Sequence, residues 1–491
     1  MPPILCAVAV RPGGPERPVL QWGDRDGGEG GMVQDGFGAP AAAWDAWRTE
    51  RGGPGPVARR GRTRLAGLVE HARRASPYYR ALYRGLPAGV DEPRLLPPVS
   101  KGALMARFDE WVTDPEVGLE ALRRDHLADE SLVGTLYLGR YRVFTTSGTS
   151  GEPVVLVHDR SSWTVAGAVL GVRARRTVLR PDVLGPVLRQ GVRAAAVLAT
   201  GGHFAAVSTA EAMRRRSRRR ARQIRVLSVL RPVPQLVAEL DDYRPTVLLG
   251  FPSTLEVLAD ELRAGRLRIA PALVAAGGET LSGAARHRIG DAFGCAVLDE
   301  YAASEVPGLA VQCHRGVLHV NADRYLLEPV DEAGRPVPAG ETSATVLVTN
   351  LANRVQPLIR YDLGDRVTVL PGPCPCGSPL PPVRVDGRAG DVLRFRSADG
   401  REVAVLPRAL AEVVGQTPGV HRFQAVRTGP RALAVRLEAE PGVDPGRVGA
   451  AVEARVRAFL AERGLGAVGV ERSPDPPRPD PSGKFREVWS A

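Results

Sequence analysis

A loop rich in hydroxyl groups and glycines is the segment of this chain whose composition points most directly to chemistry. It runs from Thr145 to Pro153 with the sequence Thr-Thr-Ser-Gly-Thr-Ser-Gly-Glu-Pro, and it joins two short β-branched runs. Backbone N–H groups and hydroxyl donors gathered in a small concavity suit phosphate oxygens. The segment is not a Walker loop, because no Gly-Lys-Ser/Thr follows it. We therefore expect a phosphate-binding loop of another kind; a plain surface turn is the alternative.

Lysine is the second chemical signal, because it is almost absent. Only two of the 66 Lys+Arg residues are lysines, Lys101 and Lys484. Arginine carries a delocalised fork of donors, whereas lysine is a compact point charge on a flexible stem. Lys484 follows Gly483, which lets the backbone approach a ligand closely. Lys484 is thus a candidate for a charge aimed at a single oxygen atom, with compositional drift in an exposed tail as the alternative.

Cysteine and histidine residues form a separate candidate metal site. Cys313, His319, Cys374 and Cys376 supply four soft or borderline ligands, the number that suits tetrahedral Zn²⁺. His314 is a rival for the histidine position, and four unligated side chains are the alternative to a metal site. The chain has five cysteines, unevenly spaced. That usage argues against a disulfide framework and for a reducing cytoplasm.

Five segments, in chain order, resemble the motifs of the adenylate-forming enzymes. The loop at Thr145–Pro153 is similar to their phosphate loop, and Asp299–Glu305 to their Tyr-Gly-x-Thr/Ser-Glu segment. Arg360–Asp365 resembles Tyr-x-x-Gly-Asp, and Gly387–Asp391 resembles the Gly-Arg-x-Asp-Asp hinge. Gly483-Lys484 is similar to the segment with the C-terminal catalytic lysine. Each match alone is weak, but five in order are specific.

Four further segments resemble the phenylacetate–CoA ligase branch: Ser76–Arg80, Leu96–Lys101, Gly250–Ser253 and Ala276–Glu279. The resemblance covers about Thr63 to Val488. It implies an ATP-dependent acid–thiol ligase, in which a carboxylate attacks ATP to give an acyl-adenylate and pyrophosphate, and CoA then displaces AMP. Lys101 belongs to the entry segment, where we expect a structural role.

The resemblance also implies a role for each matching residue. Lys484, Glu305 and Arg388 would be catalytic: Lys484 bridges the carboxylate and the α-phosphate, Glu305 holds Mg²⁺, and Arg388 reaches the ribose or a phosphate. Asp365 would accept both ribose hydroxyls and Tyr301 would lie against adenine. The other residues expected at ATP or AMP are Ser147, Gly148, Thr149, Ser150, Gly151, Gly278, Glu279 and Ser304. Members of the family can carry a structural Zn²⁺ on a cluster like Cys313, His319, Cys374 and Cys376.

Two positions depart from the family pattern. Ala302 replaces the usual glycine after the tyrosine, which puts the choice of acid in doubt. Gly390 replaces the first acidic residue of the hinge. Glycine keeps backbone freedom, so we expect rotation of the C-terminal domain to persist.

The elements that must position these residues indicate an α/β fold. Between about Tyr141 and Val385, short apolar runs alternate with helical stretches, a pattern typical of a largely parallel sheet. After Gly387, residues 403–414, 422–426, 432–437 and 448–463 predict a helix, two strands and a helix. We predict a disordered Gly/Pro-rich extension over 1–61, an N-terminal adenylation domain over 62–387 with several sheets, and a small mobile α+β domain over 388–491.

Composition limits the partners. The net charge of +12 could suit nucleic acid, but the basic run Met213–Arg222 has no interleaved aromatics and no nucleic-acid motif. A basic nucleotide- or nucleic-acid-binding protein without catalysis is therefore only the distant alternative. No run of about 18 uncharged apolar residues predicts a membrane span, and Met1–Val10 lacks the basic leader of a secretory signal. We expect a cytoplasmic protein that binds a small carboxylic acid and CoA. An amine, hydroxyl or carrier-protein thiol as acceptor, and a homodimer, are left open.

Overall fold

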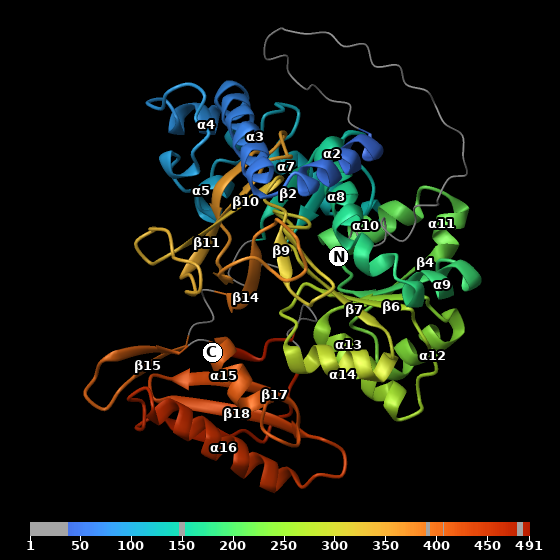
Figure 1. Ribbon diagram of the computed structural model, residues 1–491, viewed down its shortest axis with the longest axis vertical. Helices are drawn as coiled ribbons and strands as arrows, with labels where there is room; N and C mark the ends of the chain where they lie inside the picture. The colour runs from blue at the N-terminus through green and yellow to red at the C-terminus, as the bar shows by residue number, and fades with distance from the viewer. Residues whose placement is uncertain (1–37, 147–152, 389–392, 406, 479–484) are drawn as a thin grey trace.

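The computed structural model describes residues 38–146, 153–388, 393–405, 407–478 and 485–491 (Figure 1). Its largest element is a nine-stranded sheet with the order β13-β14-β9-β8-β7-β6-β5-β3-β4. The five strands at one end run parallel: β3 (Ala194–Leu198), β4 (Ile224–Ser228), β5 (Val247–Gly250), β6 (Leu273–Gly277) and β7 (Ala296–Tyr301). The predicted α/β fold with parallel strands is confirmed.

Helices cover both faces of these parallel strands. On one face, β3 contributes Ala194, Ala196 and Leu198 to a cluster with α8 (Arg160–Val178), α9 (Pro181–Gln190) and α10 (Ala205–Arg214). On the other face, Ala195 and Val197 pack with α12 (Val233–Tyr243), α13 (Pro252–Arg263) and α14 (Gly283–Phe293). Successive strand residues point to opposite faces. A strand covered on both sides is therefore apolar at every position.

Antiparallel strands complete the sheets. The large sheet continues through β8 (Ala310–Gln312), β9 (Leu318–Val320), β14 (Pro382–Arg388) and β13 (Asp365–Val369). A separate hairpin pairs β1 (Arg142–Thr145) with β2 (Val155–His158). A three-stranded sheet joins β10 (Tyr325–Val330), β11 (Thr345–Asn350) and β12 (Leu358–Asp362).

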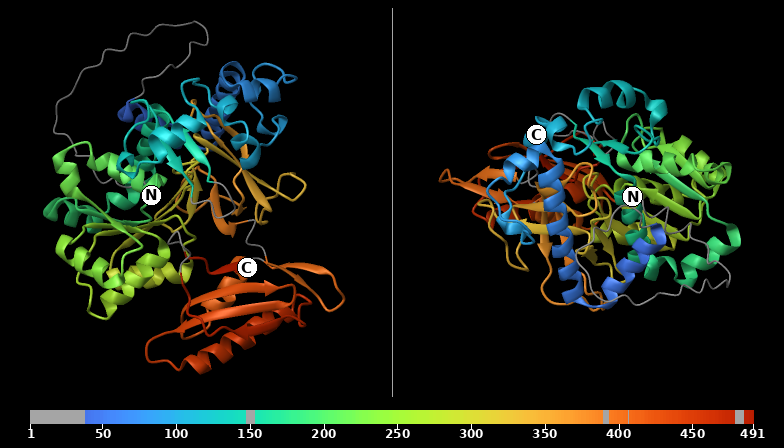
Figure 2. Two further views of the ribbon diagram at one scale, coloured as in Figure 1. Left: turned by 180° about the vertical axis from the view of Figure 1, so that it is seen from behind. Right: turned by 90° about the horizontal axis from the view of Figure 1, so that it is seen from above.

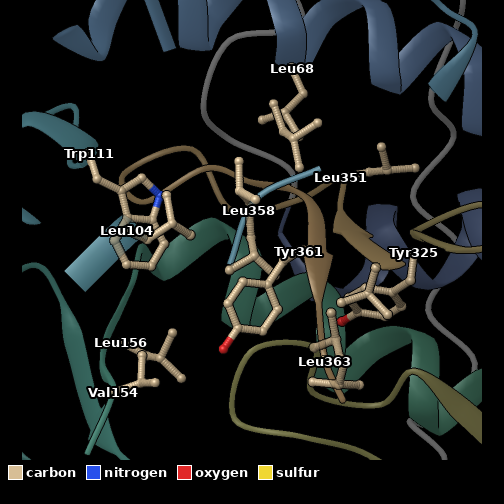
Figure 3. Packing of buried hydrophobic residues seen from close by; sticks show 14 of the residues in the cluster. Leu68, Leu104, Trp111, Val154, Leu156, Tyr325, Leu351, Leu358, Tyr361 and Leu363 are labelled. Atoms are coloured by element: carbon tan, nitrogen blue, oxygen red, sulfur yellow. The ribbon is translucent and has the colours of Figure 1, made fainter. Parts of the chain in front are cut away.

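Short helices close the side of the three-stranded sheet. They are α4 (Pro77–Leu82), α5 (Lys101–Met105), α6 (Phe108–Trp111) and α7 (Leu119–Leu122), with single turns at 93–95, 123–127 and 130–132. Figure 3 shows Leu104 and Trp111 from these helices beside Leu358 and Tyr361 of β12. The indole N–H of Trp111 donates to the carbonyl of Pro357 over 2.6 Å. Lys101 is the first residue of α5, and its structural role stays a prediction.

Residues 39–61 correct the predicted disordered extension. They form α2 (Ala39–Arg51) and the first part of α3 (Pro54–Ala75). Ala42 and Ala46 are buried against α8. The Arg173 guanidinium, 4% exposed, lies 2.7 Å from Glu50 and 3.0 Å from the fully buried Asp323. The prediction is wrong over 39–61, because α2 packs through alanines and ion pairs and so shows no large-residue apolar period. Residues 1–37 lie outside the described residues.

The C-terminal part has a core of its own, formed by residues between Leu393 and Val488. It contains the hairpin β15 (Leu393–Arg396) and β16 (Glu402–Val405), the helices α15 (Pro407–Gly415) and α16 (Pro445–Ala461), and a four-stranded sheet. The sheet has the order β19-β18-β17-β20, with β17 (Val420–Gly429), β18 (Ala432–Ala439), β19 (Gly469–Arg472) and β20 (Val488–Ser490). The helix predicted from 403 begins only at 407, because 402–405 pairs with 393–396.

This C-terminal part lies below α13 and α14 in Figure 1, and the view from behind in Figure 2 shows the same placement. The remaining helix of the N-terminal part, α11 (Arg218–Gln223), carries the second half of the basic run, and most of its residues are exposed. Among the residues that the structure describes, no helix is long and apolar enough to cross a membrane.

Candidate active site

The carboxyl ends of β6 and β7 bring two of the predicted segments together. Gly277 of β6 is the strand partner of Glu300 of β7, so Gly278 and Glu279 leave the sheet beside Tyr301. Gly278 has φ +83, and a Cβ there would lie 2.9 Å from the ring of Phe251. A side chain is therefore excluded at this turn. In open α/β sheets, ligands bind at this end of parallel strands.

Tyr301, Asp365 and Arg388 form one connected group. The Tyr301 hydroxyl donates to Asp365 Oδ2 over 2.8 Å, and Arg388 Nε lies 3.3 Å from Asp365 Oδ1. Asp365 and Arg388 face each other across β13 and β14. Burial and then the Asp365 carboxylate raise the pKa of Tyr301 well above its usual value, so the phenol stays a donor. The structure thus brings together three residues that the sequence placed at the nucleotide.

Glu305 is a buried carboxylate with few partners. It is 8% exposed, and the Tyr361 hydroxyl lies 3.5 Å from its Oε1, the outer limit of a hydrogen bond. Burial raises the pKa of Glu305; its own backbone N–H and Arg388 act in the opposite direction, and Asp365 adds to the rise. A buried carboxylate with so little compensation fits a divalent cation, and Mg²⁺ prefers oxygen ligands.

Two side chains that no sequence pattern indicated, those of His158 and Asn350, hold the backbone around Glu305. The His158 ring nitrogen Nε2 lies 2.9 Å from the carbonyl of Ser304, and the Asn350 amide donates to the carbonyl of Glu305 over 3.0 Å. Burial lowers the pKa of His158 to about 4, so the ring is neutral. The side chain of Ser304 is half-buried, and its contact with ATP or AMP stays a prediction.

The predicted phosphate loop lies mostly outside the described residues, which exclude Ser147, Gly148, Thr149, Ser150 and Gly151. Its two ends are described. The Thr146 N–H donates to the carbonyl of Val154 over 3.1 Å, and the Val154 N–H donates to the Thr146 hydroxyl over 3.1 Å. The Thr145 N–H donates to the carbonyl of His203. Both ends of the loop are therefore fixed to the β1–β2 hairpin and its neighbour.

Glu279 contacts protein donors. Its two carboxylate oxygens accept hydrogen bonds from the N–H and the hydroxyl of Ser253, each over 3.1 Å. Oε1 also accepts from the backbone N–H of Phe485 over 2.6 Å. Lys484, Gly390 and Asp391 lie outside the described residues.

Cys313, His319, Cys374 and Cys376 come together as the sequence predicted. Their ligand atoms all lie within 4.8 Å of one another. His319 Nδ1 lies 2.8 Å from the carbonyl of Leu380, and Nε2 lies 3.4 Å from the Cys376 sulfur. One ring nitrogen on a carbonyl and the other toward the thiols is the usual orientation of a metal-binding histidine.

The pKa shifts within the cluster run in different directions. Burial raises the pKa of the Cys376 thiol to about 12. Burial alone would lower the pKa of His319, but hydrogen bonds with Cys313 and the Leu380 carbonyl outweigh it and raise that pKa to about 8. Burial alone would raise the pKa of the Cys313 thiol, but hydrogen bonds from His319 and backbone N–H groups outweigh it and lower the pKa to about 6. The Ser378 N–H donates to the Cys376 sulfur over 3.3 Å. The donor set fits tetrahedral Zn²⁺, and the geometry selects His319 over His314 as its histidine.

The comparison with solved structures agrees with this architecture. No family model matches the chain, and no curated protein matches it either. A solved structure of 2-hydroxyisobutyryl-CoA ligase, in the postadenylation state with R3-HIB-AMP, has a TM-score of 0.62 and 20% sequence identity, with 89% of each chain covered. This chain has the fold of an adenylate-forming CoA ligase. The phenylacetate–CoA ligase branch stays a prediction.

A second state of that ligase matches less closely. Its structure in the thioesterification state, with 2-HIB-AMP and CoA, has a TM-score of 0.51 at 21% identity, with 90% of this chain and 91% of that chain covered. At nearly equal coverage, the fold therefore resembles the postadenylation arrangement more than the thioesterification arrangement.

Proposed function

We propose that this chain is an ATP-dependent carboxylic acid–CoA ligase that forms AMP. The observation that carries the proposal is the convergence of Glu305 with Tyr301, Asp365 and Arg388 at the carboxyl ends of the parallel strands. The fold is shared with a CoA ligase solved with an acyl-adenylate. The reaction begins when a carboxylate oxygen attacks the α-phosphorus of ATP and the bond to pyrophosphate breaks. The CoA sulfur then attacks the acyl carbon, AMP leaves, and the thiol proton passes to solvent.

Asp365 suits the ribose in this proposal. Each carboxylate oxygen has two lone-pair sites, so an oxygen that accepts from Tyr301 or contacts Arg388 can accept a second hydrogen bond. Those two partners also fix the plane of the carboxylate. Asp365 then accepts the ribose hydroxyls as a charge-assisted acceptor, while the neutral Tyr301 ring offers a face to the adenine.

In this proposal, Mg²⁺ on Glu305 and the charge of Lys484 neutralise the negative charge on the phosphate and carboxylate oxygens. Glu305 would hold Mg²⁺, which when bound neutralises charge on the phosphate oxygens. Lys484 places one mobile positive charge at the carboxylate and α-phosphate. At ~4 Å and an effective dielectric of about 20, one such pair is worth roughly 4 kcal/mol before desolvation. Contacts that exist only in the transition state convert directly into rate. Apart from this chemistry, Cys313, His319, Cys374 and Cys376 would hold a structural Zn²⁺.

A pyrophosphate-release screen over a panel of carboxylic acids, with and without CoA, tests the proposal. We expect release with one class of acid, and CoA thioester only when CoA is present. The Lys484→Ala variant should stay folded and lose acid-dependent release; near-normal release from it would refute the assignment. An adenylate that forms without thioester would assign the acyl group to an amine, a hydroxyl or a carrier-protein thiol.

A further inference from the structure

A hydrogen bond joins the C-terminal part to the residue that follows the turn at the end of β6. The backbone N–H of Phe485 donates to Glu279 Oε1 over 2.6 Å, across a sequence separation of 206 residues. Phe485 directly follows Lys484 in the sequence. The contact therefore fixes the chain at the residue next to the one lysine for which we propose a chemical role.

Two hydrogen bonds from Ser253 hold the Glu279 carboxylate in position to accept this N–H. Ser253, the second residue of α13, donates its backbone N–H to Oε2 and its hydroxyl to Oε1, each over 3.1 Å. The amino end of a helix favours a negative charge. The turn at Gly278, with φ +83, leads directly into Glu279. The carboxylate thus has a fixed position before the C-terminal part arrives.

The C-terminal part makes a second contact, with α13, the helix whose amino end binds Glu279. His421 Nε2, on β17, lies 2.8 Å from Asp260 Oδ2 on α13. Asp260 is seven residues beyond Ser253, which is about 10 Å along a helix. The guanidinium of Arg422 lies 5.6 Å from the centre of the Phe485 ring, so the chain carrying Phe485 is also tied to β17. The contacts at Glu279 and at Asp260 lie apart, so together they restrict rotation of the C-terminal part as well as its translation.

We infer that Glu279 is a positioning residue for adenylate formation: its carboxylate accepts the Phe485 N–H and so holds the chain, at the residue directly after Lys484, beside the ends of β6 and β7. The inference rests on the proposed function of Lys484. It gives Glu279 a task other than the ATP or AMP contact predicted from the sequence. Because the contact belongs to the arrangement that resembles the postadenylation state, it should matter for forming the adenylate and not for consuming it.

The first test measures the two half-reactions of Glu279→Ala separately. A hydrogen bond to a charged group contributes enough that adenylate formation should fall roughly tenfold to a hundredfold. Thioester formation from supplied acyl-adenylate and CoA should stay within about twofold, and the KM for ATP within about threefold. Equal losses in both half-reactions would show a merely structural role. A raised KM for ATP with unchanged kcat would show a nucleotide contact. Either result overturns the inference.

Glu261→Ala is the matched control. Glu261 lies on α13, the helix whose amino end binds the Glu279 carboxylate, but its own carboxylate pairs with Arg266. We expect both half-reactions of this variant to match those of the unchanged protein.

A second pair of variants tests whether Glu279 acts through the Phe485 N–H. Phe485→Pro removes that donor, whereas Phe485→Ala keeps it and removes only the ring. Adding Glu279→Ala to Phe485→Ala should lower the rate of adenylate formation by the same roughly tenfold to hundredfold that we expect for Glu279→Ala alone. Adding it to Phe485→Pro should cost less than about threefold, because the shared bond is already gone. Equal costs in both backgrounds would refute the mechanism.

Hydrogen exchange of the Phe485 amide gives a readout without substrate. We expect at least about tenfold faster exchange in Glu279→Ala than in the unchanged protein, with β17 amides unaffected. Glu279-dependent protection in a protein that forms no adenylate would refute the proposed function and leave the docking contact established. Adenylate formation with protection that does not depend on Glu279 would refute the docking and leave the function intact.

Discussion

Replacing Glu305 with glutamine should stabilise the protein while removing its proposed activity. The carboxylate is 8% exposed, with the Tyr361 hydroxyl at the long distance of 3.5 Å. Arg388 is the nearby positive group, but its side chain is 57% exposed, and exposed charges are weakened by solvent. The cost of burying the charge therefore outweighs the attraction, in agreement with the raised pKa of Glu305.

The pH dependence of the stability gain follows from the direction in which the pKa of Glu305 is shifted. A carboxyl whose pKa is raised in the folded state binds protons more readily folded than unfolded. Its contribution to stability is thus present below the ordinary pKa and is lost as the pH rises through the folded value. Glutamine carries no charge at any pH. The variant should be more stable than the unchanged protein at neutral pH, and the difference should shrink in mild acid.

The expected gain is about 1–3 kcal/mol, the cost of leaving a buried polar group poorly satisfied. Urea unfolding without ATP or Mg²⁺, at about pH 7.5 and about pH 5, measures it. Pyrophosphate release should fall by at least about a hundredfold, the scale of losing one electrostatic stabiliser.

Glu328→Gln is the control, because Glu328 is a half-buried glutamate whose pKa burial also raises. Its carboxylate pairs with the 9%-exposed side chain of Arg360 over 3.1 Å. This close pairing offsets part of the cost of burial, so Glu328→Gln should gain less stability at neutral pH than Glu305→Gln does. A Glu305→Gln protein less stable than the unchanged one at neutral pH would refute the reasoning.

Three further predictions concern the rest of the molecule. Purified protein should contain one Zn²⁺ per chain by metal analysis, and Cys376→Ser should lower both the zinc content and the thermal midpoint; essentially no zinc would contradict the cluster assignment. Tyr301→Phe removes the bond to Asp365 and should raise the KM for ATP roughly three- to tenfold, with an unchanged KM as the contrary result. Arg173→Ala leaves Asp323 and Glu50 without their shared partner and should cost about 3–5 kcal/mol in unfolding, whereas a loss below 1 kcal/mol would show that α2 does not depend on this pair.

Several features could be predicted from the sequence because their signal is local. The apolar runs at 195–198 and 273–276 predicted buried parallel strands, since a strand covered on both faces is apolar at every position. The residue types in Cys374-Pro375-Cys376-Gly377 indicated a metal knuckle, and the structure added Cys313 and His319 as expected.

Other features were decided only by the tertiary structure. Three strands lie between β7 and β13 in the sheet order, yet the Tyr301 hydroxyl reaches Asp365. The sequence also gave no sign that His158 would hold the Ser304 carbonyl, nor that α2 would pack through alanines. Above all, the sequence assigned Glu279 to the nucleotide, whereas the fold places Ser253 and Phe485 on its oxygens. Local patterns fix which residue types stand at a strand end. Which distant donor meets them depends on how the strands and the two parts of the chain are arranged in space.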